Sequence, residues 1–233
     1  MTKEPTYTSK TGKDINYTFM LSQISHEINN PLTLIYSTVQ LLSYRHPELN
    51  KDELWSQLLS DIDYLKQLTV SLSSYNQCSH LTIESSDITL LLTDIEAAWL
   101  PYAQQTGKQL IFKYDDQLPA IECDSLKIKQ CLINLIKNSF EATNADDTIE
   151  ITASAKSDML ITVSDSGKGL EAKQLQHIFE PFASYKSGGS GLGLAITEKI
   201  IKAHHGSIQV TSKFGSGTRF MIRLPLYLSL IHI

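Results

Sequence analysis

Near its N-terminus the chain reads SHEINNPL over residues 25–32, inside a long apolar run with helical spacing. One row of the run repeats every seven residues and a second row flanks it: Leu21, Ile28, Ile35 and Leu42, then Ile24, Leu32 and Val39. This pattern predicts a long helix that packs against other helices. His26 falls opposite the first row, in line with Thr33 and Gln40, so we expect it to face solvent. Taken alone, it is an exposed histidine on an amphipathic helix.

A second helix is predicted after a break. The first helix covers about residues 15–45, and Pro47 ends it because proline cannot continue a helix. The second covers about residues 51–75, with leucines again seven apart at Leu58, Leu65 and Leu72. Two long helices and a short connection form an antiparallel hairpin. Its apolar faces are too wide for one hairpin to bury, so we expect a homodimer that forms a four-helix bundle.

The bulk composition excludes several classes of protein. With 233 residues, 42% hydrophobic residues and a net charge of -5, the chain suits one or two folded domains and lacks the basic clusters of a nucleic-acid surface. No apolar run reaches about 18 residues, so we expect no membrane contact from this segment. The first 15 residues are polar, without the core of a signal peptide. Three cysteines without metal-type spacing indicate a reducing cytoplasm.

The composition changes after Asn76, which divides the chain into a linker (1–15), the hairpin (16–77), a second domain (78–226) and an apolar tail (227–233). The second domain mixes helices and strands without strict alternation. We predict helices after Asp87, over 124–143 and over 192–204. The predicted strands cover 109–114, 120–123, 148–155, 159–165, 207–212 and 218–224. This order favours an α+β sandwich, a mixed sheet with helices on one face.

Two amides stand out in the helix predicted over 124–143. Asn134 and Asn138 are one turn apart and share a helix face. Amide oxygens are suitable ligands for Mg²⁺, which keeps waters and shares phosphate oxygens. The alternative is that they are polar edges of an amphipathic helix.

An acid followed by two glycines ends a predicted strand, at Asp165, Gly167 and Gly169. A carboxylate there can accept a hydrogen bond from an exocyclic amine such as that of adenine, and glycines let a ligand approach the backbone. With Ala172 the glycines loosely match a dinucleotide-binding fingerprint. That fingerprint needs a βαβ unit, and the segment around Pro181 interrupts any such helix, so we reject it.

A glycine-rich loop over residues 184–194 runs into the N-terminus of an apolar helix. Unpaired amides and the helix dipole make such a junction an anion site, to which Lys186 adds a charge. The loop is not a Walker loop, because no Gly-Lys-Ser/Thr closes it. The alternative is a solvated linker. Phe179 and Phe182 are expected in the core beneath the loop.

Together these segments resemble the five motif boxes of the sensor histidine kinases of two-component systems. The resemblance covers residues 16–226 and rests on these residues in order: His26-Glu27-x-x-Asn30-Pro31, Asn134-x-x-x-Asn138, Asp165-x-Gly167-x-Gly169, Phe179-x-x-Phe182 and Gly189-x-Gly191-x-Gly193. The ending Gly215-x-Gly217-Thr218 also matches. Each box is weak alone, whereas the ordered series is specific.

For the hairpin, the resemblance implies a dimerisation and phosphoacceptor domain. His26 matches the phosphorylated residue, and Glu27 matches the acid that takes or orients the imidazole proton. Asn30 matches the position that orients water when the partner response regulator is dephosphorylated, so a regulator phosphatase activity is also implied. Pro31 implies a helix kink just after the histidine.

For the second domain, the resemblance implies ATP binding of the gyrase, chaperone and kinase type. Asn138 matches the principal Mg²⁺ ligand and Asn134 lies beside it, where ATP-hydrolysing relatives carry a glutamate. Asp165 matches the residue that binds the adenine amine. Ser139, where alanine is common, departs from the pattern without affecting the chemistry. The remaining residues implied at the nucleotide are Gly167, Gly169, Lys186, Gly189, Gly191, Leu192, Gly193 and Thr218.

Three functions therefore stay open. The first is ATP-dependent autophosphorylation on His26, with transfer to an aspartate of a receiver domain. The second is an ATP hydrolase whose hairpin only dimerises, against which the amide at Asn134 argues. The third is a non-catalytic ATP-binding scaffold, against which the intact motifs argue.

Overall fold

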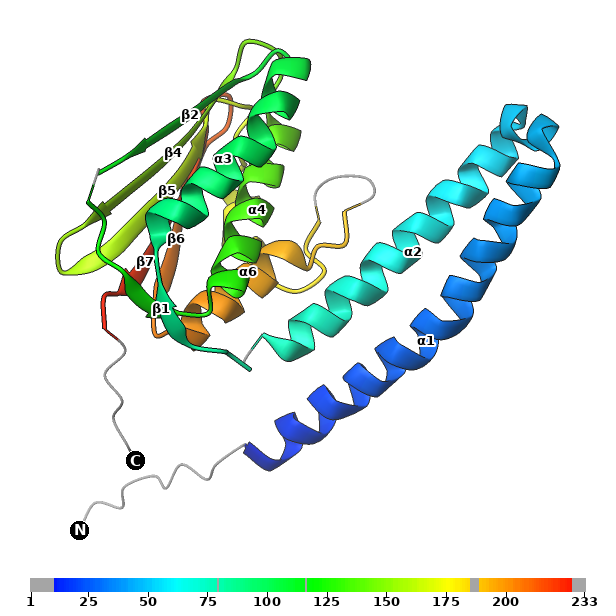
Figure 1. The fold of residues 1–233 in the computed structure, drawn as a ribbon, viewed down its shortest axis with the longest axis horizontal. Coiled ribbons are helices and arrows are strands. Elements are labelled where there is room, and N and C mark those ends of the chain that lie inside the picture. The colour runs from blue at the N-terminus through cyan, green and yellow to red at the C-terminus, as the bar shows by residue number, and fades with distance from the viewer. Residues whose placement is uncertain (1–10, 79, 116, 185–188, 228–233) are drawn as a thin grey trace. The chain divides into compact units, whose positions relative to one another are not determined.

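The computed structural model describes residues 11–78, 80–115, 117–184 and 189–227, with side chains from residue 27 onward. The chain divides into two compact units, Met1–Gln77 and Cys78–Ile233. In the described residues the first unit is helical, whereas the second combines helices with a sheet (Figure 1).

An antiparallel hairpin forms the first unit. Its elements are α1 (Thr11–Arg45), the 3-10 helix η1 (Pro47–Lys51) and α2 (Glu53–Gln77). The N–H of His46 donates to the carbonyl of Leu42 at 2.8 Å, and Pro47 then begins η1. Asp52 starts α2 by accepting a hydrogen bond from the N–H of Leu54 at 2.8 Å. The predicted break at proline and the hairpin are both confirmed.

The two apolar rows of the hairpin have different environments. Buried on its inner face are Leu32, Val39 and Ile62, with Tyr36, Trp55 and Leu59 packed against them. In the rows spaced by seven residues, large side chains remain exposed: Ile28, Ile35, Leu42, Leu58 and Leu65. One row therefore closes the hairpin, and the adjacent row leaves a broad apolar surface open.

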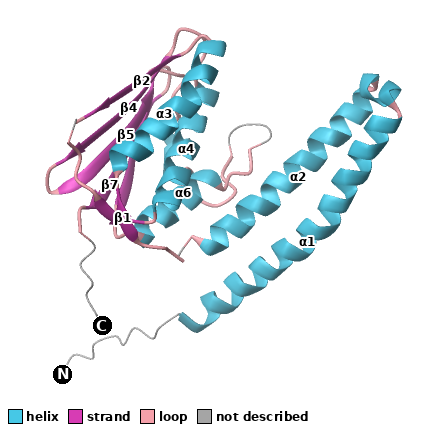
Figure 2. Ribbon diagram, viewed as in Figure 1, coloured by secondary structure: helices cyan, strands magenta, loops and turns pink. Residues whose placement is uncertain are grey.

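A five-stranded mixed sheet organises the second unit, in the order β2-β4-β5-β7-β6. Its strands are β2 (Gln109–Tyr114), β4 (Thr148–Ala155), β5 (Asp158–Asp165), β6 (Ser207–Lys213) and β7 (Gly217–Pro225). β2 pairs with β4 in parallel, and the other pairs are antiparallel. The helices α3 (Ile88–Gln105), α4 (Ser125–Ala142) and α6 (Gly193–Ala203) lie on one face of the sheet (Figure 2). The predicted mixed sheet with helices on one face is confirmed.

The core lies between this sheet and its helices. Along β7, Phe220, Ile222 and Leu224 are buried, whereas Arg219 and Arg223 are exposed, as the two-residue period of a strand requires. α4 contributes a wide buried face made of Ile128, Cys131, Leu132, Leu135, Ile136, Ser139 and Phe140. This apolar face anchors α4 against the sheet and leaves its remaining face available for polar groups.

Asp124 fixes the N-terminal end of α4. Its carboxylate accepts hydrogen bonds from the N–H groups of Lys127 (3.0 Å) and Thr82 (2.9 Å). Its own N–H donates to Nε2 of the buried His204 at 3.0 Å. The predicted N-cap therefore also ties two distant segments to the start of the helix.

Lys108 fixes the C-terminal end of α4. Its ammonium group donates to the carbonyls of Phe140 (2.5 Å) and Thr143 (2.8 Å) and lies 5.5 Å from the centre of the Phe140 ring. A cation at the last carbonyls of a helix satisfies them and complements the helix dipole. α4 is thus held at both ends.

The sequence pattern does not predict two short elements, β1 (Glu84–Ser86) and α5 (Ala172–His177). β1 pairs with β3 (Ile121–Cys123) in a separate two-stranded sheet. α5 buries none of its residues, so it has no apolar period to detect. Its one signal is the capping box between Glu171 and Gln174.

The three cysteines, Cys78, Cys123 and Cys131, form no disulfide and are buried, as expected for small apolar side chains. Burial raises the pKa of each thiol above its ordinary value. Across the described ranges, no helix is both long and apolar enough to cross a membrane.

Candidate functional site

The two predicted amides lie on one side of α4. Asn134 and Asn138 are both half-buried. The amide nitrogen of Asn134 donates to the hydroxyl of Thr197 at 3.0 Å, and that hydroxyl bonds the carbonyl of Gly193 at 3.0 Å. A Cβ on Gly193 would lie 2.4 Å from Oδ1 of Asn134, so a larger residue here would displace the Asn134 side chain. The first turn of α6 therefore packs directly against the Asn134 amide.

Asp165 ends β5 and is held by three donors. Its Oδ1 accepts from the N–H groups of Gly167 (3.0 Å) and Thr218 (3.3 Å), and its Oδ2 accepts from the Ser139 hydroxyl (3.2 Å). Burial raises the pKa of Asp165, and these hydrogen bonds oppose that rise. An ionised carboxylate has about four acceptor positions, so room for one more donor remains.

Glycines let three backbone segments converge beside Asp165. A Cβ on Gly167 would lie 2.3 Å from the carbonyl oxygen of Ala142 at the end of α4. A Cβ on Gly169, where φ is +65°, would lie 2.2 Å from the carbonyl oxygen of Lys213 at the end of β6. The turn after Asp165 is therefore wedged between α4 and the β6–β7 hairpin.

The glycine-rich loop enters α6 with one turn fixed by packing. Gly191 has a φ of +65°, and a Cβ there would lie 2.5 Å from the carbonyl carbon of Phe182. Leu192 is fully buried in this structure, so its side chain packs in the core. Its N–H donates to the hydroxyl oxygen of Ser190 at 3.3 Å. Gly189 is half-buried, and Lys186 lies outside the described residues.

The expectation that Phe182 belongs to the core is wrong. Its side chain is 62% exposed, and its φ of 66° is unusual for a residue other than glycine. Phe179 is half-buried, and Ile178 is the buried residue of this segment. The backbone of Phe182, rather than its ring, supports the loop, because Gly191 packs against it.

These contacts form two clusters joined by α4. One joins Asp165 with Ser139 and Thr218, and the other joins Asn134 with Gly193. Asn138 precedes Ser139 in sequence and lies one turn from Asn134 on the same helix. The Asp165 carboxylate, which can accept a hydrogen bond from an amine, therefore lies near one end of α4. The side-chain amide of Asn134 lies further along α4, beside the N-terminus of α6.

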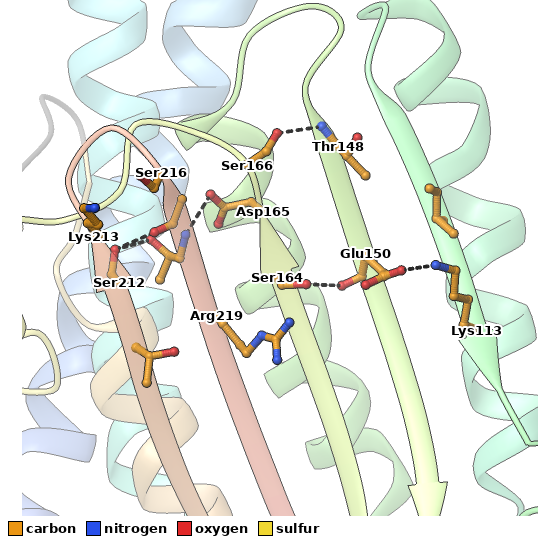
Figure 3. Close-up of a pocket in the computed structure, with 14 residues that line it drawn as sticks. Lys113, Thr148, Glu150, Ser164, Asp165, Ser166, Ser212, Lys213, Ser216 and Arg219 are labelled. Carbon is orange, nitrogen blue, oxygen red and sulfur yellow. Dashed lines mark hydrogen bonds and ion pairs between the residues drawn. The ribbon is translucent and has the colours of Figure 1, made fainter.

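A separate open pocket of about 700 Å³ lies at the end of the sheet where Asp165 lies (Figure 3). It shares Asp165 and Thr218 with the first cluster. Side chains of Glu150, Ser164 and Arg219 project into it from the face of the sheet away from the helices (Figure 3). None of the amides or loop glycines named for phosphate or metal lines it, so it is distinct from the surface along α4.

No residue group that commonly holds a resident metal occurs in the described part of the chain. There, no three or more His, Cys, Asp or Glu side chains are grouped to bind an ion. Asn134 and Asn138 offer amide oxygens instead. Mg²⁺ bound through one or two protein oxygens completes its shell with phosphate and water, so this donor set fits a metal that arrives with a nucleotide.

In the hairpin, the predicted phosphoacceptor motif lies on α1. Glu27 and Asn30 are exposed, whereas the side chain of His26 lies outside the described part of the structure. Thr33 and Gln40, expected in line with His26, are exposed. The hydroxyl of Thr33 donates to the carbonyl of Asn29 at 2.8 Å, beside the proline that lacks an N–H.

Two protein families match the two units. The His Kinase A (phospho-acceptor) domain matches residues 17–77. The family described as histidine kinase-, DNA gyrase B- and HSP90-like ATPase matches residues 123–228. The hairpin and the sheet unit therefore each match a known domain family.

Curated relatives match this chain over most of its length. The sensor histidine kinase ZraS of Escherichia coli O157:H7 is 34% identical over 205 residues, covering 87% of this chain and 45% of ZraS. Sporulation kinase B of Bacillus subtilis (strain 168) is 31% identical over 210 residues, covering 88% of this chain and 49% of that kinase. This chain thus spans about half the length of these curated relatives.

Solved structures are also similar to this chain. Full-length ShkA in complex with AMPPNP matches with a TM-score of 0.76 and 26% identity, covering 89% of this chain and 46% of ShkA. The histidine kinase ThkA in complex with the response regulator protein TrrA matches with a TM-score of 0.63 and 25% identity, covering 89% and 61%. The chain belongs to the sensor histidine kinases and carries their phosphoacceptor and ATPase-type domains.

Proposed function

We propose that this chain transfers the γ-phosphoryl group of ATP to His26 and then to an aspartate of a response regulator receiver domain. The observation that carries the proposal is the presence, in one chain, of the exposed Glu27 and Asn30 motif on α1 and of the Asp165 cluster. Positioning and charge neutralisation supply most of the catalysis in such a transfer.

Asp165 binds the exocyclic amine of adenine in this proposal. Three donors hold its carboxylate in one orientation, and one acceptor position remains for the amine. Thr218 and the glycines Gly167 and Gly169 form the wall beside the base. The amides from Gly189 to Gly193, with Lys186, contact the phosphates, since a helix N-terminus favours anions.

In this proposal Asn138 and Asn134 would hold Mg²⁺. When bound, the ion neutralises charge on the phosphate oxygens. Asn134 carries an amide rather than a carboxylate, so it cannot act as a general base toward water. The site is therefore suited to keep ATP intact until His26 reacts.

At His26, a ring nitrogen attacks the γ-phosphorus in line, and the bond from that phosphorus to the bridging oxygen of ADP breaks. Glu27 takes or orients the proton on the other ring nitrogen, as general-base help to a nitrogen nucleophile. In the reverse direction, Asn30 orients the water that removes phosphate from the regulator. This assigns a kinase and a regulator phosphatase activity to the same motif.

Each of the two domains has its own role in this proposal. We assign residues 16–77 to dimerisation and phosphotransfer and residues 78–226 to ATP binding, working in the cytoplasm. The exposed row that contains Ile28, Ile35 and Leu58 supports a homodimeric four-helix bundle. The tail after 226 has no assigned role.

The test is incubation with γ-labelled ATP and Mg²⁺. We expect an acid-labile, base-stable label on the protein that is absent from His26→Gln and that a receiver domain removes. Absence of label from the wild-type protein under all conditions contradicts the proposal. Steady phosphate release that His26→Gln does not change favours the ATP hydrolase, and tight binding of ATP without label or release favours the scaffold.

A further inference from the structure

Two side-chain hydrogen bonds join the helices of the hairpin at equivalent positions. Trp55 Nε1 donates to the hydroxyl of Ser43 at 2.8 Å, and the hydroxyl of Thr69 donates to the amide oxygen of Asn29 at 2.5 Å. Ser43 lies two heptads after Asn29 on α1, and Trp55 lies two heptads before Thr69 on α2. The two bonds therefore lie on the same stripe of each helix and differ mainly in their level along the hairpin.

Only one of these bonds adjoins the phosphoacceptor motif. The Ser43–Trp55 bond lies beside the connection between the helices, whereas Asn29 is one turn after His26 on α1. The buried cluster that contains Leu32, Val39 and Ile62 separates the two levels in sequence.

Thr69 occupies a position where an apolar residue is expected. Together with Trp55 and Ile62 it continues a row of α2 residues spaced by seven, and its side chain is 7% exposed. A buried hydroxyl contributes little to stability and needs a partner. The Thr69 hydroxyl has two: the carbonyl of Lys66 on its own helix at 2.9 Å and, across the hairpin, the amide oxygen of Asn29. A buried polar pair in a mainly apolar helix seam is well suited to fix the register of the helices.

The backbone of α1 is weakly held at this level. Pro31 has no N–H, so the carbonyl of Glu27 has no helical donor four residues on. The hydroxyl of Thr33 bonds the carbonyl of Asn29, a contact that tends to bend helices. A side-chain bond to α2 therefore constrains a turn that its own backbone ladder constrains poorly.

We propose that Asn29 and Thr69 are positioning residues that fix the rotation of the α1 turn carrying His26 and Glu27. The inference rests on the proposed kinase function. In-line attack tolerates little misplacement of the nucleophile, so loss of this bond slows phosphorylation of His26. The apparent KM for ATP does not change, because the pair is in the hairpin rather than in the nucleotide-binding unit.

The experiment compares matched variants of the full chain. Thr69→Val removes the hydroxyl at nearly constant shape, Thr69→Ser keeps it, and Ser43→Ala removes the equivalent bond at the other level. For each, we would measure the initial rate of label incorporation against ATP concentration, together with the melting temperature and the dimer content.

We expect Thr69→Val to lower the maximal rate by about three- to thirtyfold with an unchanged KM, in keeping with the cost of small misplacements. Thr69→Ser should retain the wild-type rate. Ser43→Ala should also retain it, despite lowering the melting temperature about as much as Thr69→Val does. This combination separates positioning from a general loss of stability.

Equal rates for Thr69→Val and Ser43→Ala overturn the inference and leave the kinase proposal standing. A wild-type protein without label overturns both. If Thr69→Val does not fold, the double variant Asn29→Leu with Thr69→Val takes its place, because it leaves no polar group unpaired. A wild-type rate for that folded double variant would also overturn the inference.

Discussion

The carboxylate of Asp165 is held in an orientation that suits ligand binding, but its burial lowers the stability of the folded protein when the group is ionised. Burial raises the pKa of this group, which means that the folded protein disfavours the ionised form. Its contribution to stability is therefore greatest at low pH and is lost as pH rises through the raised pKa. A residue kept charged under this penalty is suited to recognition of a ligand.

We predict that Asp165→Asn folds at least as stably as the wild-type protein and binds ATP about ten- to hundredfold more weakly. An amide oxygen still accepts the N–H groups of Gly167 and Thr218, whereas a hydrogen bond to a charged group contributes about 1.5–3 kcal/mol. Thermal melting and nucleotide titration measure the two effects. Wild-type affinity in the variant would show that Asp165 does not bind the base.

Two glycines at the turn between β6 and β7 should lose different amounts of stability when each is replaced by alanine. Gly217 has a φ of +98°, and a Cβ there would lie 1.9 Å from the carbonyl oxygen of Asp165. Gly217→Ala should lose at least about 3 kcal/mol of stability, as in other large single-site losses. Gly215 has a φ of +77° and open space, so Gly215→Ala should lose only about 1–2 kcal/mol. Urea denaturation measures both, and equal losses would contradict the role of the close contact.

His204 predicts a dependence of stability on pH. Burial lowers its pKa below the ordinary value of 6.5, and the neutral ring bonds both the Ile200 carbonyl (2.8 Å) and the Asp124 N–H (3.0 Å). Because the unfolded chain binds the proton more readily, stability should fall as pH drops below about 6.5. Denaturant titrations between pH 5 and 8 should show a smaller fall in His204→Gln. The control is His205→Asn, which should retain most of the wild-type fall, because the charge of His205 is the smallest of the influences on the pKa of His204 and asparagine tolerates the φ of 57° at this exposed position.

At the scale of elements, α4 depends on the residues at its ends. Lys108→Met should lower stability by about 1–3 kcal/mol, because it leaves the carbonyls of Phe140 and Thr143 without their charged donor. Lys137→Met is the matched control. Lys137 lies on the same helix, is largely exposed and pairs with Glu141 only at 4.0 Å, so its loss should be within about 0.5 kcal/mol. Denaturant unfolding compares the two, and similar losses would contradict the capping role.

The sequence predicts most elements because their residues have a clear period or a clear cap. The strands 109–114 and 148–155 match the structure residue for residue, since the first is a short apolar run and apolar side chains alternate along the second. The short α5 has no buried residue and therefore no period. In the hairpin, spacing alone does not decide between two adjacent apolar rows. The structure buries Leu32 and Val39, whereas Ile28 and Ile35 remain exposed.

Local spacing predicts which site residues lie together only where those residues share one element. Asn134 and Asn138 are one turn apart in the sequence, and α4 contains both. The bond from Ser139 to Asp165 spans 26 residues and forms only when β5 packs on α4, so no local pattern indicates it. For the same reason the sequence does not predict that Lys108 closes α4.

For the whole molecule, the exposed row of the hairpin predicts dimerisation. Ile35→Glu should raise the dimer dissociation constant by at least about 100-fold, because burying a charge in an apolar interface costs several kcal/mol. Gln40→Glu adds the same charge at an exposed position outside the row and should leave the dimer unchanged. Sedimentation equilibrium distinguishes them, and a dimeric Ile35→Glu protein would place the interface elsewhere.

The three buried thiols also make the protein suited to chemical labelling. Cys78 begins the second unit, and Cys131 lies in α4 against the carbonyl of Thr197. Each is shielded from solvent and has a raised pKa, so a thiol reagent reacts only when the surrounding structure opens. The rate at which each cysteine is modified therefore reports the opening of its own region, and a cysteine introduced on the surface reacts against a silent background.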